Sequence, residues 1–226
     1  MIKKRLPLLT LILTLNFTLS AEDYKPQLFK SMELIYENDF SKDGPPSPEQ
    51  WTIRQSSTWI QKDGILHGSE APKDFQKKKL ASPDPTHAGL RPVIFLTPIP
   101  EDFVFQCRLR YDGKFTSSQC CELSFGHHLQ EFKFGKDSST FTLHKDKKTT
   151  QKLKDLVVPL GKWVEVTAEL TKGRFIVTID GVSKTYENSV ICLIKSDGEK
   201  SYQIDFKGLN FGTVQIDWVK LYKGIK

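Results

Sequence analysis

Residues 162–187 read K-W-V-E-V-T-A-E-L-T-K-G-R-F-I-V-T-I-D-G-V-S-K-T-Y-E, and this stretch decides the fold class. From Trp163 to Leu170 polar and apolar side chains alternate, the period of two that is typical of a half-buried β-strand. A Thr-Lys-Gly-Arg turn leads to a second alternating run from Phe175 to Ile179, and Asp180-Gly181 then marks a tight hairpin turn. Two linked hairpins, rich in aromatic and β-branched residues, predict an all-β protein.

The N-terminus has the three parts of a secretory signal peptide. Residues 1–5 are basic, residues 6–19 are largely apolar, and Ser20-Ala21 supplies small residues at the end. A membrane anchor needs about 20 apolar residues, and this run is shorter and is interrupted by a proline and an asparagine. We therefore expect a signal peptide over residues 1–21, cleavage after Ser20 or Ala21, and a periplasmic or secreted mature chain without membrane insertion.

Length and charge narrow the class of protein further. Of the 226 residues, about 205 remain after the leader, which suits one large β-sandwich over residues 22–226 with its core at about 34–222. The net charge is +6, and the leader carries three of those positive charges. The other lysines are interspersed with Asp and Glu, as in residues 145–154, which is typical of solvated loops. We therefore expect no nucleic-acid partner.

The chain has four cysteines, Cys107, Cys120, Cys121 and Cys192, which allow three disulfide pairings. Cys107 and Cys121 each share an alternating face with apolar residues, so we expect both to be small buried core residues. A bridge between them, across neighbouring strands, is compatible with the sequence, but a domain of this size does not require one. No C-x-x-C motif or zinc-type spacing is present, so the sequence excludes a structural zinc site.

Short alternating runs continue along the rest of the chain. Residues 103–111 and 214–222 are examples, and Gly, Asp and Pro separate such runs at a spacing of roughly ten residues. Residues 69–85 are polar, charged and proline-containing and are expected to form a long surface loop. No segment holds a sustained helical period. The pattern predicts a β-sandwich or jelly roll.

Several of these runs carry a family resemblance. The segments K-D-G-I-L-H-G (62–68), F-V-F-Q-C-R-L-R-Y (103–111), G-K-W-V-E-V-T-A-E-L (161–170) and I-D-W-V-K-L-Y (216–222) together resemble the 3-keto-disaccharide hydrolase domain family. The resemblance implies a concanavalin A-like, laminarinase-type jelly roll and an oxidised disaccharide or glycoside as the carbohydrate partner. Short exported members carry His-Ala and Gly-His segments, which here correspond to His87-Ala88 and Gly126-His127.

The leading site candidates lie in C-E-L-S-F-G-H-H, residues 121–128. If the apolar residues of this run face the core, Glu122 faces the opposite surface, which in a curved jelly roll forms the ligand groove. Alternation places His128 beside Glu122 and lets only one of the adjacent histidines line the groove. The resemblance instead favours His127, brought round by a bulge or turn after Gly126. We predict His127 and Glu122 as catalytic and His128 as substrate-binding; the alternative is a pair of surface histidines at a turn.

Three further residues complete the predicted site. His87 is placed in the catalytic set and Arg91 in the substrate-binding set, because an imidazole and a guanidinium amid small residues can hold a sugar hydroxyl or an enolate oxygen. Trp218 is predicted to stack on a sugar ring. The alternatives are a loop histidine for His87 and core packing for each tryptophan. His67 and His144 have no carboxylate neighbour in the sequence and are expected to be bystanders.

Retaining laminarinase-type glycosidases need two carboxylates about 5 Å apart, usually from a Glu-x-Asp-x-x-Glu motif, which the sequence lacks. A ketone at C3 of a sugar acidifies the C2 proton, so that one histidine and a polarising cation are enough to drive elimination. The predicted function is therefore exported lyase or hydrolase cleavage of 3-keto-glycosides, with His87 and His127 in one groove. The alternative is a non-catalytic carbohydrate-binding or surface-interaction module on the same fold. The sequence establishes no cofactor, and it leaves open whether a divalent cation binds.

Overall fold

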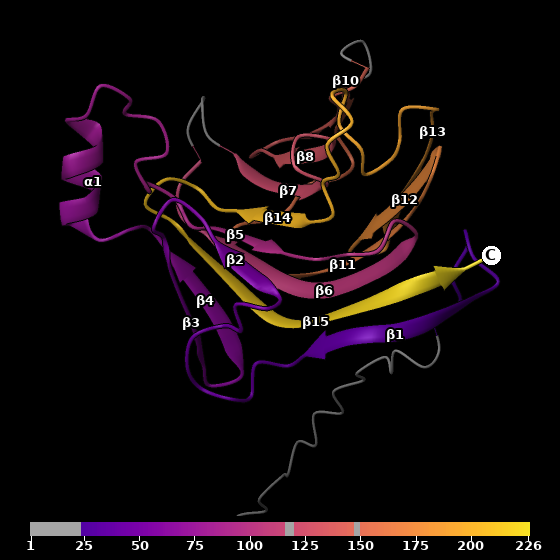
Figure 1. The fold of residues 1–226 in the computed structure, drawn as a ribbon, viewed down its shortest axis with the longest axis horizontal. Helices are drawn as coiled ribbons and strands as arrows, with labels where there is room; N and C mark the ends of the chain where they lie inside the picture. Colours follow the sequence, from indigo (N-terminus) through magenta and orange to yellow (C-terminus); the bar gives the residue numbers. More distant parts are fainter. Residues whose placement is uncertain (1–23, 116–119, 147–149) are drawn as a thin grey trace, which may run out of the picture.

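The computed structural model describes residues 24–115, 120–146 and 150–226, and these form two antiparallel β-sheets with one hydrophobic core between them (Figure 1). The expected leader, residues 1–21, lies outside the described residues. No helix in the described ranges has the length and apolar character needed to cross a membrane. The all-β jelly roll expected from the sequence is confirmed.

Sheet A, the larger of the two, has the strand order β13-β12-β11-β6-β15-β4-β3, and β1 also pairs with β15. In chain order, its strands are β1 (Ser31–Asn38), β3 (Thr58–Lys62), β4 (Ile65–Ser69), β6 (Phe103–Asp112), β11 (Trp163–Thr171), β12 (Arg174–Ile179), β13 (Val182–Glu187) and β15 (Thr213–Ile225).

Sheet B has the order β10-β9-β8-β7-β14-β5-β2 and lies on the inner side of the bend that both sheets share (Figure 1). In chain order, its strands are β2 (Trp51–Ile53), β5 (Val93–Leu96), β7 (Cys121–Phe125), β8 (Gln130–Phe134), β9 (Ser139–Leu143), β10 (Thr150–Leu153) and β14 (Ile204–Lys207).

The stretch that decides the fold class forms β11, β12 and β13, as the alternation predicted. Asp180 and Gly181 close the second hairpin with φ of 46° and 80°, the left-handed geometry that an Asp-Gly turn provides. The apolar residues of β11 face the core, and Val166 pairs with Cys107 on β6. This hairpin pair therefore builds one end of sheet A.

Aromatic side chains fill the space between the sheets. The largest that belong to strands and have almost no exposed surface are Phe103, Phe105, Tyr111, Phe125, Phe132, Phe134, Phe141, Phe175 and Phe206. They come from both sheets. Phe125 of sheet B stacks on Phe103 of sheet A at a ring-centroid distance of 6.1 Å and meets Phe175 of sheet A in a tilted contact at 5.1 Å. Truncating one such ring to alanine typically costs about 3–5 kcal/mol, so this layer holds the sandwich together.

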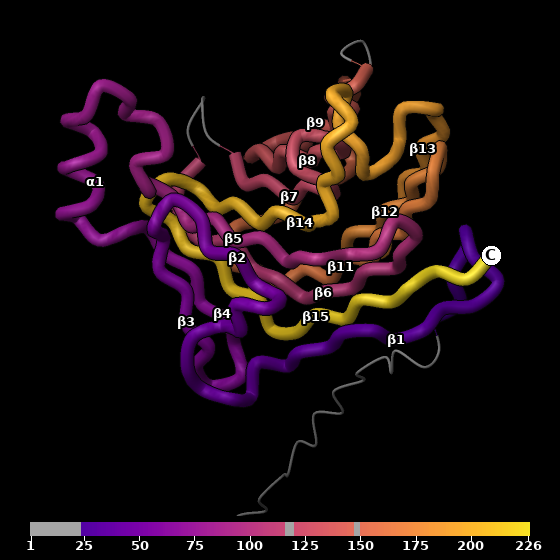
Figure 2. Tube along the Cα trace, in the orientation of Figure 1, coloured from indigo at the N-terminus to yellow at the C-terminus, as the bar shows by residue number. Residues whose placement is uncertain are grey.

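The structure corrects the expectation that residues 69–85 form only a loop. They contain the eight-residue helix α1 (Lys73–Leu80), which stands apart from the two sheets in Figure 2. Pro72 precedes it, Asp74 lies in its first turn and three lysines lie in its last turn, an arrangement that complements the helix dipole. Gln76 is its only buried residue, so the helix has no apolar face and leaves no helical period in the sequence.

The structure does not place Cys107 and Cys121 on neighbouring strands, the arrangement that a bridge between them was expected to have. Cys107 and Cys121 are both buried, as predicted, but they belong to β6 of sheet A and β7 of sheet B and not to neighbouring strands. All four cysteines are free thiols in the structure.

Candidate functional site

The outer face of sheet B carries two neighbouring rows of polar and charged side chains. In the first row, the strand register pairs Glu122 of β7 with Lys207 of β14 on one side and with Lys133 of β8 on the other. Lys207 in turn pairs with Val93 of β5. Because Leu123 points into the core, Glu122 points outward, as alternation predicted.

The second row runs beside the first. Ser124 of β7 pairs with Asp205 of β14 and with Glu131 of β8, and Asp205 pairs with Phe95 of β5. Asp205 has no exposed side-chain surface and Glu131 only 2%. Carboxylates are buried to this degree only when other groups compensate their charge. The partners of these two acids therefore define the site.

A four-residue turn places both adjacent histidines over this face. β7 ends at Phe125, and the Leu129 N–H donates to Gly126 O at 3.0 Å to close the turn. Gly126 has φ of 75°, and a Cβ there would lie 2.7 Å from Leu129 Cδ1, so glycine is needed at this position. His128 also adopts a left-handed conformation, with φ of 57°. The turn after Gly126 that the sequence suggested is present.

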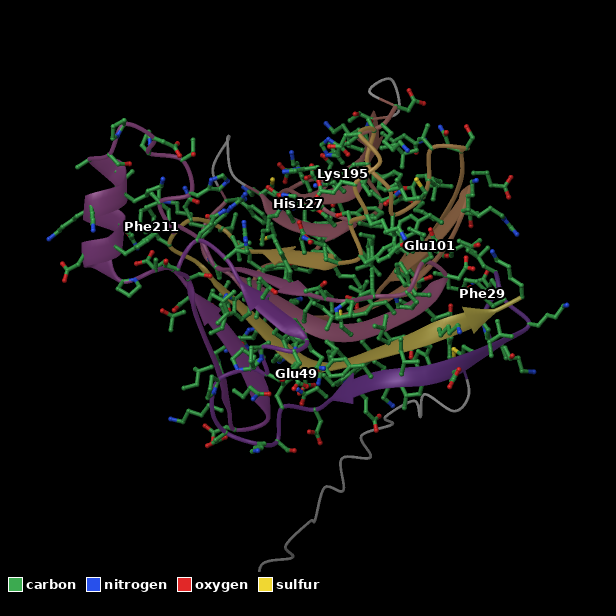
Figure 3. All side chains as sticks on the ribbon, in the orientation of Figure 1. Phe29, Glu49, Glu101, His127, Lys195 and Phe211 are labelled. Atoms are coloured by element: carbon green, nitrogen blue, oxygen red, sulfur yellow. The ribbon has the colours of Figure 1, made fainter. Side chains whose placement is uncertain are left out.

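His127 is held by a buried carboxylate. Its Nδ1 lies 2.6 Å from Asp205 Oδ2, and its backbone N–H donates to Ser201 Oγ at 2.6 Å. Gln203 Nε2 donates to the other oxygen of Asp205 at 2.7 Å. In the described part of the chain no group hydrogen-bonds to His127 Nε2. Figure 3 shows His127 above sheet B, on the side away from the core.

A cavity of about 330 Å³ opens beside this pair and is lined by His87, Arg91, His127 and His128, the four cavity residues that the sequence had singled out. Both adjacent histidines line it, which corrects the expectation that only one could do so. The reason is that they lie in a turn and not in a strand, so strict alternation does not apply to them. His87 and His127 share one groove, as predicted.

Other residues shape the walls of the cavity. Phe95 packs against the His127 ring at a centroid distance of 5.4 Å, and the Arg54 guanidinium lies 5.6 Å from the centroid of the same Phe95 ring. Lys207 also lines the cavity, although only 5% of its side chain is exposed. The cavity therefore combines imidazoles with three cationic side chains and one aromatic wall.

Glu122 lies behind the cavity and does not line it. Its Oε1 accepts from Arg91 Nη1 at 2.9 Å and its Oε2 from Lys207 Nζ at 3.0 Å. Burial opposes ionisation, but Lys207 and Arg91 outweigh it and lower the pKa of Glu122 to about 2. A carboxyl group in this setting stays ionised at neutral pH. These contacts favour a positioning role for Glu122 over proton transfer. The carboxylate holds the Arg91 and Lys207 side chains at the cavity wall.

His128 has a second set of neighbours. Its Nδ1 lies 3.9 Å from Glu131 Oε2, and its ring lies 5.7 Å from that of His144 at the end of β9. Burial lowers the pKa of His128, and the nearby His127 and Lys207 lower it further. His144 was expected to be a bystander without a carboxylate neighbour; instead its Nε2 lies 3.2 Å from Glu131 Oε1.

Trp218 lies far from this site in the topology, on the outer face of sheet A. A bulge between Ile216 and Trp218 puts the tryptophan opposite Arg108 of β6, on the face away from the core. Its side chain is half-buried. Trp218 does not line the histidine cavity, so the structure does not bring it together with the other predicted residues.

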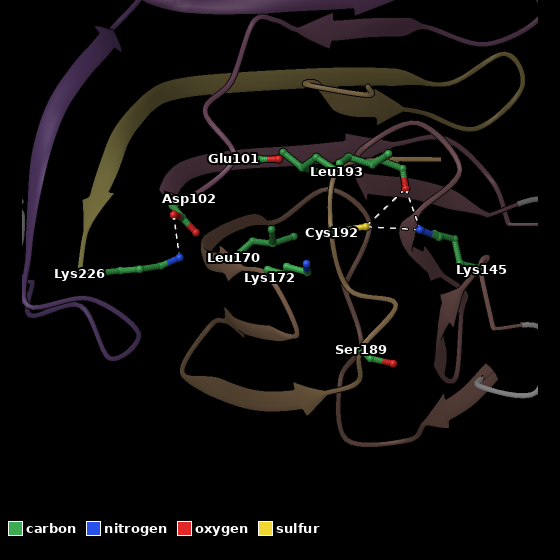
Figure 4. Close-up of a pocket in the computed structure, with 10 residues that line it drawn as sticks. Glu101, Asp102, Lys145, Leu170, Lys172, Ser189, Cys192, Leu193 and Lys226 are labelled. Carbon is green, nitrogen blue, oxygen red and sulfur yellow. Dashed lines mark hydrogen bonds and ion pairs between the residues drawn. The ribbon is translucent and has the colours of Figure 1, made fainter. Parts of the chain in front are cut away.

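A second cavity, of about 450 Å³, lies elsewhere in the molecule and is shown in Figure 4. It contains Cys192 and Lys145, whose Sγ and Nζ atoms are 3.6 Å apart, and the Asp102–Lys226 ion pair at 2.9 Å. It is the larger of the two, but no imidazole lines it. The histidine cavity is therefore the better candidate for acid–base chemistry.

Sequence reasoning missed Asp205, Lys207 and Glu131. The segment I-D-F-K (204–207) carried a signal, because its buried Ile and Phe place Asp205 and Lys207 together on the opposite face. Nothing in the sequence showed that this four-residue strand pairs with β7, about 80 residues away along the chain.

Comparisons with known proteins support the fold. No protein-family model matches the sequence, and no curated protein matches it. SCLam, a non-specific endo-β-1,3(4)-glucanase from family GH16, is 13% identical with a TM-score of 0.56, over 88% of this chain and 94% of that chain. β-agarase B from Zobellia galactanivorans is 12% identical with a TM-score of 0.51, over 86% of this chain and 94% of that one.

A third structure is a toxin and not an enzyme of this group. Botulinum neurotoxin type C, described in terms of its interaction with two ganglioside molecules, is 12% identical with a TM-score of 0.50, over 86% of this chain and 49% of that chain. Identities this low show the fold alone. The chain is therefore a two-sheet antiparallel sandwich of the laminarinase-type jelly roll, a fold that it shares with GH16 glucanases and with a ganglioside-binding toxin.

Proposed function

We propose that this chain is an exported carbohydrate-active enzyme that cleaves 3-keto-glycosides by eliminating the glycosidic oxygen, with His127 as the base. The observation that carries the proposal is the 2.6 Å contact between His127 Nδ1 and the fully buried Asp205 at the wall of a cavity. With Nδ1–H donated to Asp205, the lone pair of Nε2 is available to a bound sugar. Related folds in glycoside hydrolases support a carbohydrate ligand.

The reaction balances with a single base. His127 Nε2 takes the C2 proton, and the electron pair of the C2–H bond forms an enolate with its negative charge on the C3 oxygen. When the C3 carbonyl re-forms, a C1=C2 double bond appears, the C1–O bond breaks, and the departing alcohol takes the proton from the imidazolium. Arg91 and Lys207 line the cavity and supply positive charge for the enolate oxygen. Addition of water to C1 would complete a net hydrolysis.

Glycoside hydrolysis by double displacement fits these residues less well. β7 and the turn after it carry Glu122, Ser124 and His127 at the spacing of the Glu-x-Asp-x-x-Glu motif, so that a histidine stands where the second glutamate would be. Glu122 is held by two cations with a pKa of about 2, which makes it a poor nucleophile. Such an enzyme needs one free carboxylate and one protonated carboxyl.

The second candidate function is carbohydrate binding without catalysis. The observation in its favour is that Glu122 and Asp205 are both engaged by neighbouring side chains, which suits a rigid binding surface. A cavity of about 330 Å³ is at the small end of the range for ligand pockets. This reading predicts that a sugar binds and is released unchanged.

The two functions separate in a turnover assay. A nitrophenyl 3-keto-glycoside and its non-oxidised parent are incubated with the wild-type protein, with His127→Ala and with the control His67→Ala on sheet A. We expect the wild type and the control to release nitrophenol from the keto substrate alone, and His127→Ala to be slower by about 100- to 10,000-fold. Binding of the keto substrate without turnover would support the binding module and refute the enzyme.

Export is proposed separately. Residues 1–20 or 1–21 are predicted to be removed, which leaves a mature chain that begins at Ala21 or Glu22. N-terminal sequencing of the protein recovered from the periplasm or the medium tests this. A mature protein that retains Met1 and residues 2–21 would refute it.

A further inference from the structure

We propose that His128, Glu131 and His144 bind one divalent transition-metal ion, with zinc as the best-fitting probe, at the border of the histidine cavity. Two imidazoles and one carboxylate form the donor set of zinc sites that keep an open coordination position. Each residue offers one ligand atom, and the three atoms lie within 4.8 Å of one another. His128 also lines the cavity, so the ion would lie at its edge.

The distances suit a shared ion. His144 Nε2 lies 3.2 Å from Glu131 Oε1, and His128 Nδ1 lies 3.9 Å from Glu131 Oε2. Two atoms bound to one tetrahedral zinc at about 2.0–2.2 Å are separated by about 3.4 Å. The first pair is already at that separation. The His128 side chain, 58% exposed, has the freedom to close the remaining gap.

The fold holds the three ligands from three different segments. Glu131 belongs to β8, where it pairs with Thr142 of β9. His144 follows the end of β9, and its backbone N–H donates to Leu129 O in the turn that carries His128. These backbone hydrogen bonds fix the three Cα positions before any ion arrives, which lowers the cost of ordering the site.

Unsatisfied polar atoms point to the same place. Glu131 is 2% exposed, and within the described residues neither its buried Oε1 nor the buried Nε2 of His144 makes a hydrogen bond. Oε1 of Glu131 lies 3.2 Å from His144 Nε2 and forms an ion pair with Lys133 Nζ at 2.9 Å. Buried polar atoms without a hydrogen bond call for another partner, and a bound cation would satisfy both.

Lys133 is the competitor for this position. Its side chain is 43% exposed, so its ammonium group can move into solvent when an ion binds Glu131. If Lys133 is instead the permanent counter-charge of Glu131, no metal binds there. Metal binding to the wild type separates the two arrangements, because the ion binds only in the first. In that case Lys133→Met removes a competing cation and should not weaken metal binding. The proposal does not rest on the sugar chemistry, because metal binding is measured without substrate.

The test uses the chelator-treated protein, titrated with ZnSO₄ by calorimetry and with Co²⁺ by visible absorption. We expect one equivalent of zinc to bind, with a tetrahedral Co²⁺ spectrum, and Lys133→Met to bind at least as tightly as the wild type. Mutating a residue that hydrogen-bonds to a metal ligand typically costs 10- to 100-fold in metal affinity, so the loss of a ligand in His144→Ala or Glu131→Gln is expected to cost more than about 100-fold. His67→Ala, the control on sheet A, should bind like the wild type.

Circular dichroism and thermal unfolding establish that each variant is folded. If buried Glu131→Gln does not fold, His144→Ala decides, because the His144 side chain is 34% exposed. The proposal is overturned if the wild type binds no stoichiometric metal, or if folded His144→Ala binds zinc as tightly as the wild type. It is also overturned if Lys133→Met abolishes binding.

Discussion

His127 Nδ1 lies 2.6 Å from Oδ2 of Asp205, although 78 positions of sequence separate the two residues. One comes from a turn and the other from the short strand β14, and the pairing of β14 with β7 brings them together. A buried carboxylate that accepts from Nδ1–H fixes both the tautomer and the orientation of an imidazole. This relationship gives the cavity its proposed base.

The first prediction concerns Asp205→Asn. An amide in this position can no longer hold the Nδ1–H tautomer, so we expect kcat for the keto substrate to fall by about 100- to 10,000-fold with little change in KM. Asp217→Asn is the matched control, because Asp217 pairs with Arg108 on the outer face of sheet A. Steady-state kinetics on both variants check this. An equal loss in the two, or a loss confined to KM, would contradict the orienting role of Asp205.

The second prediction concerns Glu122→Gln and pH. This carboxyl has a pKa of about 2 in the folded protein, below its ordinary value of 4.5. Its contribution to stability is therefore present above about pH 4.5 and is lost as the pH falls towards 2, an effect on the order of 3 kcal/mol. The variant also leaves Arg91 and Lys207 without their shared anion, so we expect a loss of about 3–5 kcal/mol at pH 7.

Unfolding in denaturant at pH 7 and pH 3 measures the effect of Glu122→Gln. The difference in the free energy of unfolding between wild type and variant should be smaller at pH 3 than at pH 7. Glu187→Gln serves as the control, because its ion pair with Arg174 is exposed and should change stability by less than about 1 kcal/mol. A difference for Glu122→Gln that stays constant with pH would contradict the assigned ionisation.

The third prediction concerns Glu169, a carboxylate with no exposed surface on the outer face of sheet A. It accepts from Tyr24 Oη at 2.6 Å and from the backbone N–H groups of Gln27 and Leu28 at 2.8 Å each. Burial and this carboxylate raise the pKa of Tyr24. We expect Glu169→Ala to free the segment before β1, with faster hydrogen exchange at the amides of Gln27 and Leu28.

Glu165→Ala is the control for Glu169→Ala, since Glu165 is an exposed residue on the same face of β11. Hydrogen exchange followed by mass spectrometry checks both. Unchanged protection of the two amides in folded Glu169→Ala would show that the carboxylate does not hold this segment.

The fourth prediction concerns Gly126→Ala. An alanine at φ of 75° is strained by about 1–2 kcal/mol, and its Cβ would also meet Leu129 Cδ1 at 2.7 Å. Gly181→Ala, at φ of 80° with open space around it, carries the strain alone. We expect Gly126→Ala to be the less stable of the two by about 1–3 kcal/mol, and to alter the environment of His127, as seen in its imidazole NMR signals. If the two variants have the same free energy of unfolding, the contact with Leu129 costs nothing and the prediction is wrong.

Much of the scaffold could be predicted because its signals are local. The alternation in residues 162–187 and the Asp180-Gly181 turn give three strands of sheet A, and the alternation in β7 places Glu122 on the outer face. Helix α1 could not be predicted, since its only buried residue is Gln76 and it has no apolar stripe.

The site depends on non-local pairing, which a single sequence does not reveal. β14 is four residues long, and only its register with β7 shows that Asp205 lies beside His127. Glu131 also depends on non-local pairing, because its partners His128 and His144 come from a turn and from the end of β9. Trp218 was assigned to the site as an outward-facing tryptophan, and the sequence does not tell which sheet carries the cavity.

The central claim is that His127 removes the C2 proton of a 3-keto sugar. A 3-keto-glycoside labelled with deuterium at C2 tests it most directly, with the sugar product analysed by NMR and mass spectrometry after cleavage in ordinary water. We predict that the wild-type protein releases a sugar product that has lost the label, and that His127→Ala releases almost none. A cleaved sugar that keeps its C2 deuterium would contradict the account, because the glycosidic bond would then have broken without proton abstraction at C2.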